Sequence, residues 1–62
     1  MYILIKDIKI KNKGEAARRI GINISTLSRI LHKKQKCSKM TAYCITKYIN
    51  KNAEMNTYFK RI

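Results

Sequence analysis

The chain has 62 residues, and a domain of this size buries only about 60% of the surface that its unfolded chain exposes. Its 15 Lys and Arg residues outnumber its 3 Asp and Glu residues, which gives a formal net charge of +12 at pH 7. So large a charge on a single small domain, residues 1–62, points to a polyanionic partner. No apolar run reaches the length of about 18 residues that a membrane span needs, so we expect no membrane partner.

Residues that catalysis or metal binding would use are few and scattered. The three carboxylates stand in three separate segments, whereas paired-carboxylate chemistry needs two of them at one site. His32, Cys37 and Cys44 include no CxxC pair and no fourth metal ligand. We therefore expect no enzyme activity, no metal and no cofactor, and we interpret Cys44 as a small core residue and Cys37 as a loop thiol. Two cysteines and no signal peptide favour a cytoplasmic protein with reduced thiols.

The first eleven residues match a helix and a strand about equally well. One set of apolar residues has helical spacing: Met1, Leu4, Ile5 and Ile8. A second set occupies even positions, and its isoleucines favour a strand: Tyr2, Leu4, Ile8 and Ile10. We favour a helix or helical turn over residues 6–11 and leave residues 2–5 open between helix and extended chain. We assign only solubility to the lysines of this region, Lys6, Lys9 and Lys11.

A short helix is predicted over residues 15–20. Asn12 can cap its free backbone N–H groups, and Glu15 can reach back as in a capping box. Gly21 fits the left-handed position at which many helices end.

A second helix follows over residues 24–32, with Asn23 as its cap. Its apolar face is formed by Leu27, Ile30 and Leu31, at positions i, i+3 and i+4.

Two further helices complete the predicted fold. Ser38 can cap a helix over residues 39–50, with an apolar stripe at Thr41, Cys44, Ile45 and Tyr48. Apolar residues at helical spacing predict a last short helix over residues 54–61: Met55, Tyr58, Phe59 and Ile62. The fold class is therefore predicted to be all-α, a compact bundle of four to five short helices with an N-terminal segment that is helical or extended.

The first two helices and the turn between them are the most informative feature. A turn of three residues, Gly21-Ile22-Asn23, between two short helices is the helix-turn-helix arrangement. Ala17 is small enough for the helices to cross closely, and Gly21 supplies the positive φ that the turn needs. The stretch 12–31, NKGEAARRIGINISTLSRIL, resembles the helix-turn-helix DNA-binding domain of the phage repressor/Cro type. Lys33 departs from that family, in which a glycine often follows the second helix.

The resemblance implies a sequence-specific, double-stranded DNA-binding transcriptional regulator, a repressor of the Cro type encoded by a phage or mobile element. The helix at residues 23–32 would lie in the major groove. Arg29 would read guanine, because its fork matches the two acceptors of that base, and Ile24 would contact a thymine methyl group. The base-contacting set is predicted to be Ile24, Ser25, Thr26, Ser28 and Arg29.

Phosphate contacts are predicted on both sides of this helix. The start of the preceding helix offers free N–H groups and the positive end of the helix dipole. The lysines of the following loop would hold the DNA backbone on the other side. The phosphate-contacting set is predicted to be Asn12, Lys13, Asn23, Lys33, Lys34, Lys36 and Lys39.

A homodimer, at least on DNA, is expected because a single recognition helix reads only a few base pairs. The candidate interface is Tyr58, Phe59 and Ile62, with Tyr43 and Tyr48 near. Phe59 and Tyr48 could instead belong to the core, and the N-terminal segment is a rival contact. Non-specific binding of nucleic acid, including RNA, is the alternative function. It would need exposed aromatic residues among basic ones, and residues 12–31 contain none. No small-molecule ligand is expected.

Overall fold

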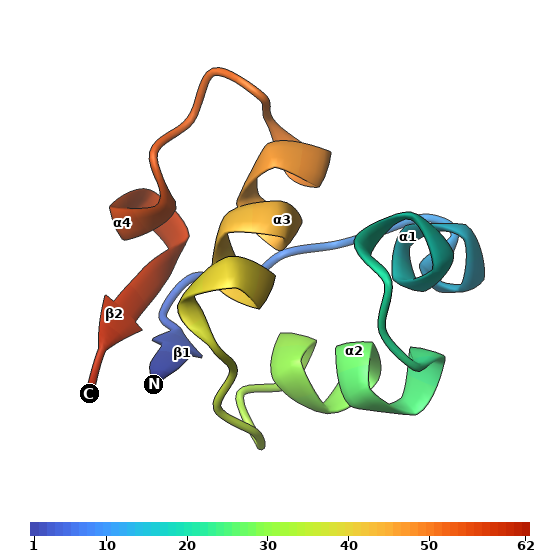
Figure 1. The fold of residues 1–62 in the computed structure, drawn as a ribbon, viewed down its shortest axis with the longest axis horizontal. Helices are drawn as coiled ribbons and strands as arrows, with labels where there is room; N and C mark the ends of the chain where they lie inside the picture. The colour runs from blue at the N-terminus through green and yellow to red at the C-terminus, as the bar shows by residue number, and fades with distance from the viewer.

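The computed structural model describes residues 1–62 as four helices and two short strands (Figure 1). In chain order the elements are β1 (Tyr2–Leu4), α1 (Lys13–Ile20), α2 (Ile24–Leu31), α3 (Lys39–Ile49), α4 (Met55–Tyr58) and β2 (Phe59–Arg61). None of the helices is both long and apolar enough to cross a membrane.

The two strands show that the predicted all-α fold class is wrong, since the fold is mixed α/β. β1 and β2 form an antiparallel sheet in which Tyr2 faces Arg61 and Leu4 faces Phe59. The predicted last helix ends at Tyr58, because Phe59 adopts an extended backbone with φ −125° and ψ 148° and joins β1. The helix favoured over residues 6–11 is absent, and that segment runs from the sheet to α1 without regular structure.

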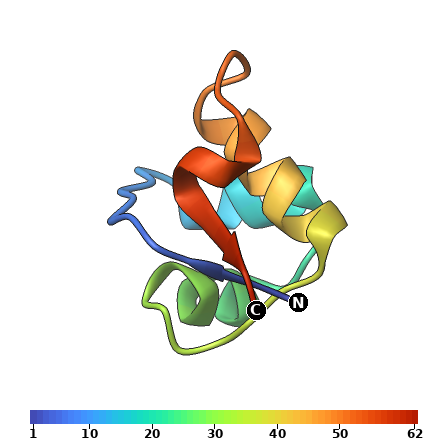
Figure 2. The same ribbon diagram turned by 90° about the vertical axis from the view of Figure 1, so that its left-hand side faces the viewer.

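β1 lies between the C-terminal strand and the segment that joins α2 to α3. On this second side, the N–H of Tyr2 donates to the carbonyl of Cys37, and the N–H of Cys37 donates to the carbonyl of Tyr2, each at 2.8 Å. The chain termini consequently lie side by side in both views of the ribbon (Figures 1 and 2). The first residues of the chain therefore fix both its last residues and the loop that follows α2.

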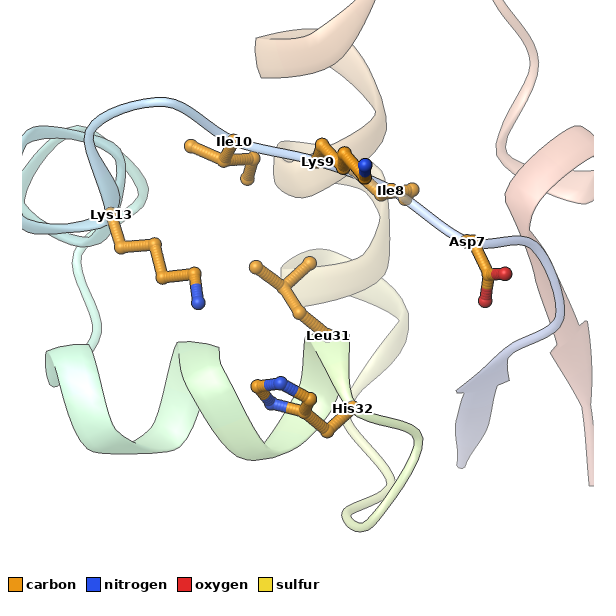
Figure 3. A pocket seen from close by; sticks show the side chains of 7 residues that line it. All are labelled: Asp7, Ile8, Lys9, Ile10, Lys13, Leu31 and His32. Carbon is orange, nitrogen blue, oxygen red and sulfur yellow. The ribbon is translucent and has the colours of Figure 1, made fainter.

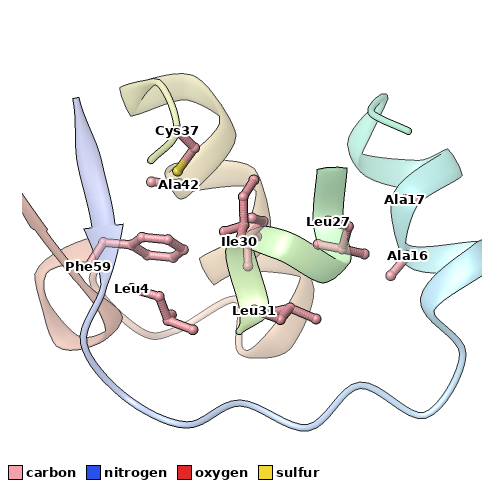
Figure 4. Close-up of a cluster of buried hydrophobic side chains, with 10 residues drawn as sticks. Leu4, Ala16, Ala17, Leu27, Ile30, Leu31, Cys37, Ala42 and Phe59 are labelled. Atoms are coloured by element: carbon pink, nitrogen blue, oxygen red, sulfur yellow. The ribbon is translucent and has the colours of Figure 1, made fainter. Parts of the chain in front are cut away.

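The core joins the sheet to α1, α2 and α3 (Figure 4). Its buried apolar residues are Leu4, Ala16, Ala17, Leu27, Ile30, Leu31, Cys37, Ala42, Ile45 and Phe59. Thr46 is the only buried polar residue, and its hydroxyl donates to the carbonyl of Ala42 at 2.9 Å. α3 buries Ala42, Ile45 and Thr46, so the stripe predicted from residue 41 to residue 48 is correct only at Ile45.

The predicted environments of the two cysteines are wrong, since Cys44 was expected in the core and Cys37 was expected as a loop thiol. Cys37 is buried, because its backbone pairs with Tyr2 and carries the side chain beneath the sheet, whereas Cys44 is partly exposed. Burial also raises the pKa of the Cys37 thiol, which disfavours the reactive thiolate form. Both thiols are free.

The three predicted side-chain caps are confirmed. Asn12 accepts a hydrogen bond from the N–H of Glu15 at 3.0 Å, and Asn23 accepts one from the N–H of Ser25 at 2.7 Å. Ser38 accepts one from the N–H of Thr41 at 3.2 Å. Each bond satisfies one of the backbone donors that a helix start leaves without an intrahelical partner.

Candidate nucleic-acid interface

α1 and α2 pack against each other across a tight turn that begins at Gly21. Gly21 has φ 91°, as predicted, and its N–H and that of Ile22 donate to the carbonyl of Ala17 at 2.8 and 3.0 Å. Ala17 is itself buried, and Leu27 is fully buried on α2. The turn and the core therefore fix the direction of α2 relative to α1.

The outer side of α2 is polar and accessible. Leu27, Ile30 and Leu31 face the core, so the residues on the opposite side of the helix face away from it. Ile24, Ser25 and Arg29 are exposed, whereas Thr26 and Ser28 are half-buried. The five predicted base-contacting residues thus share one short helix, and three of them are exposed.

The side chain of Arg29 is held by the loop that follows α2. Its Nε–H donates to the side-chain oxygen of Gln35 at 2.8 Å. This bond uses one of the five N–H donors of the guanidinium and leaves four for another partner. Gln35 was assigned no role from the sequence, but here it positions the guanidinium.

His32 extends the outer face of α2 by one further position and was not among the predicted contacts. The side chain is exposed, and its Nδ1 lies 2.8 Å from the carbonyl oxygen of Ser28. Because a carbonyl oxygen can only accept, Nδ1 is the donor in this contact, and Nε2 makes no hydrogen bond within the chain. The spacing of Ser25, Ser28 and His32 at i, i+3 and i+7 is the signal that could have identified it.

A hollow of about 450 Å³ lies between the start of α1 and the end of α2 (Figure 3). Lys13 extends into it from α1, and His32 lies opposite, at the end of α2. The irregular segment before α1 crosses this hollow and brings Lys9 to its border. Lys9, assigned only to solubility from the sequence, therefore lies beside a predicted phosphate-contacting residue. We call this feature the α1–α2 hollow; its lining is Asp7, Ile8, Lys9, Ile10, Lys13, Leu31 and His32.

The two asparagines of the predicted phosphate set are exposed caps. The side-chain oxygens of Asn12 and Asn23 are engaged by the N–H groups of Glu15 and Ser25. Their side-chain amide groups make no hydrogen bond within the chain, so each retains donors suited to a phosphate.

Residues 33–37, which we call the basic connector, leave α2 through a left-handed residue. Lys33 has φ 62°, the only positive φ outside glycine. Its N–H donates to the carbonyl of Ile30 at 3.0 Å, and the N–H of Lys34 donates to that of Arg29 at 2.9 Å. This pair of bonds is the Schellman ending, in which the left-handed residue is usually glycine. The predicted phosphate-contacting lysines of the connector and of the start of α3 are all exposed: Lys33, Lys34, Lys36 and Lys39.

One carboxylate borders this basic surface. Asp7 accepts a hydrogen bond from the ammonium of Lys33 at 2.8 Å, and its side chain is 93% exposed. This hydrogen bond and the charge of Lys33 hold the pKa of the Asp7 carboxyl below its usual range. An ion pair so open to solvent is weak, so the lysine can exchange its partner at little cost.

The three residues of the predicted dimer contact have different environments. Phe59 is 1% exposed and fills the core, whereas Ile62 is 51% exposed. Tyr58 is half-buried, with the ammonium of Lys6 at 6.0 Å from the centre of its ring. Only Ile62 and part of Tyr58 are therefore available to a second copy.

Comparison of the chain with protein-family models, with curated proteins and with solved structures finds no match.

Proposed function

We propose that the protein is a sequence-specific, double-stranded DNA-binding transcriptional regulator that reads the major groove with α2. The observation that carries this proposal is the outer side of α2, where Ser25, Arg29 and His32 are exposed on one face. That face adjoins the α1–α2 hollow and the basic connector, and residues 24–39 contain no carboxylate. The resemblance of residues 12–31 to phage repressors of the Cro type agrees with this geometry.

In the proposed complex, polar residues of α2 meet base edges. Arg29, steadied by Gln35, directs its remaining donors at the two acceptors of guanine. Ile24, half exposed at the start of the helix, contacts a thymine methyl group. Ser25, Thr26 and Ser28 donate or accept as the base pair requires.

Phosphates are held on both sides of α2. The start of α1 contributes Asn12, Lys13 and unpaired backbone N–H groups, which the helix dipole makes favourable for an anion. Asn23 contacts a phosphate at the start of α2, and the exposed lysines of the connector hold the backbone beyond its end.

Two copies bind together in this proposal, since one α2 contacts only a few base pairs. Half-sites one helical turn apart lie about 34–36 Å apart. The Cα trace measures 26 × 25 × 19 Å, so two copies are small enough to lie side by side at that separation. A regulator of this kind acts in the cytoplasm of a bacterial cell or a phage-infected host.

Selection of bound sequences from a random duplex pool tests this function. We expect a palindromic consensus, and we expect Arg29→Ala to relax the preference at one base of each half-site by about 1–3 kcal/mol. Lys13→Ala should instead weaken binding to all sequences alike, while Lys51→Ala, the same charge loss at the turn after α3, should change affinity little. Equal affinity for every sequence would reject specific reading and support the alternative of a non-specific nucleic-acid-binding module.

A further inference from the structure

α3 exposes large apolar side chains on the side that faces away from the core. Met40 is 70% exposed and Tyr43 is 51% exposed, although the opposite side of the helix is buried. The two residues are three positions apart and therefore neighbours on the helix surface. Methionine and tyrosine are enriched where proteins contact one another, so this face suggests an interaction surface.

Beside this face runs a groove of about 290 Å³ between α3 and the last turn of α1. Its apolar lining, formed by Ile20, Tyr43, Cys44 and Tyr48, can cover an apolar side chain of another protein. We call it the α1–α3 groove; it is lined by Arg19, Ile20, Tyr43, Cys44, Lys47 and Tyr48.

Both charged residues of the α1–α3 groove are basic. The ammonium of Lys47 donates to the carbonyls of Ala53 at 2.8 Å and Lys51 at 3.3 Å, and it lies 5.3 Å from the centre of the Tyr43 ring. These contacts fix its position without neutralising it. Arg19 is exposed and makes no ion pair.

No carboxylate of this chain forms an ion pair with either cation of the groove, although Glu15 lies one turn before Arg19 on α1. Glu15 lines a neighbouring hollow that shares Tyr48, but it does not line the groove itself. The groove therefore combines apolar lining residues with two cations, Arg19 and Lys47, that have no ion-pair partner. Such a surface is complementary to an acidic segment that carries an apolar side chain.

Other occupants fit this chemistry less well. A second copy of the chain offers only 3 carboxylates beside its 15 Lys and Arg residues, so it has little acidic surface to pair with Arg19 and Lys47. The groove includes no residue of α2, so it shares no side chain with the recognition face proposed for DNA. We propose that the α1–α3 groove binds an acidic segment of a partner protein, which places an aliphatic or aromatic side chain against the apolar lining of the groove and directs carboxylates at Arg19 and Lys47.

Fluorescence anisotropy with labelled synthetic peptides tests the proposal. The probe places Leu and Phe at helical spacing among Glu and Asp; one control replaces the acids by Lys, and another replaces Leu and Phe by Ala. We expect the chain to bind the probe at least tenfold more tightly than either control. Tyr43→Ala, which removes an aromatic contact, should weaken the probe at least tenfold.

Arg19→Glu and Lys60→Glu form a matched pair, since both reverse one exposed charge and only the first lies in the groove. Arg19→Glu should weaken probe binding at least tenfold more than Lys60→Glu, with circular dichroism confirming that both variants are folded. Equal weakening by the two variants, or no binding at millimolar peptide, would overturn the proposal. Tighter binding of oligo(dT) than of the peptide, lost in Tyr43→Ala, would also overturn it and show that the groove stacks bases.

Discussion

Lys33 occupies a backbone position that favours glycine and also supplies a positive charge to the proposed DNA face. Its backbone occupies the left-handed position that ends α2, where a side chain costs roughly 1–2 kcal/mol relative to glycine. Its ammonium lies on the proposed DNA face, where it makes a weak, solvent-exposed ion pair with Asp7. The sequence showed the departure from glycine, and the structure shows that the backbone nevertheless keeps the conformation that glycine favours. We infer that a lysine at this position lowers the stability of the fold relative to glycine.

Lys33→Gly should therefore stabilise the fold and weaken DNA binding. We expect a gain of about 0.5–1 kcal/mol in the free energy of unfolding, because relief of the left-handed backbone exceeds the extra entropy of an unfolded glycine. Urea denaturation measures this gain, and anisotropy with DNA should show a loss of affinity that is the same for every sequence.

Lys34→Gly is the matched control for this prediction, because Lys34 has the same charge without a positive φ. It should weaken DNA binding without stabilising the fold. NMR titration adds a second check: the Asp7 carboxyl should titrate at higher pH in Lys33→Gly than in the native chain, because the group that lowers its pKa is gone. A Lys33→Gly variant less stable than the native chain would contradict the argument.

Among the elements, β1 has an influence beyond its three residues. It pairs with β2 on one edge and with Cys37 on the other, and it contributes Leu4 to the core at 2% exposure. Both partners come from distant parts of the chain, so this strand closes the fold and fixes the position of the basic connector. We infer that the stability of the connector depends on β1.

Leu4→Ala should lower the free energy of unfolding by about 2–5 kcal/mol, because it removes buried methyl groups and leaves a cavity between the sheet and α2. Ile5→Ala is the control, since Ile5 follows the strand and is 48% exposed. Thermal unfolding followed by circular dichroism measures both. A loss at Leu4 no greater than that at Ile5 would show that β1 only covers a core that is stable without it.

The helices α1, α2 and α3 were predictable because their signals are local. Asn12, Asn23 and Ser38 cap the helices that follow them, as expected, and each cap needs only the next two or three residues. The strands were not predictable in this way, because three residues give too short a pattern and their partners lie at the other end of the chain.

The same distinction between local and distant signals explains individual errors in the predicted fold and site. Phe59 fits a helical stripe in sequence, but its pairing with Leu4 draws it into a strand. Cys37 was interpreted as a loop thiol because no residue near it in sequence indicates that its backbone pairs with Tyr2. Lys9 lines the α1–α2 hollow because residues 6–11 cross the fold there, and this path is not evident from the local sequence.

At the scale of the whole molecule, the lysines that give the net charge of +12 fall into two groups, those on the proposed DNA face and those outside it. The lysines of the proposed DNA face come from three separate segments: Lys9, Lys13, Lys33, Lys34, Lys36 and Lys39. Others, such as Lys51 and Lys60, lie outside that face, where they can steer DNA toward the molecule without contacting it. Binding to DNA would also stabilise so small a fold by mass action.

The salt dependence of DNA binding should separate these two groups of lysines. Neutralising about six phosphates per copy predicts a slope of about −5 in a plot of log affinity against log salt concentration. Lys9→Ala should make the slope shallower by about 0.9, because one phosphate contact is lost. Lys60→Ala removes the same charge from β2 and should leave the slope unchanged. Equal slopes for Lys9→Ala and the native chain would show that Lys9 makes no phosphate contact.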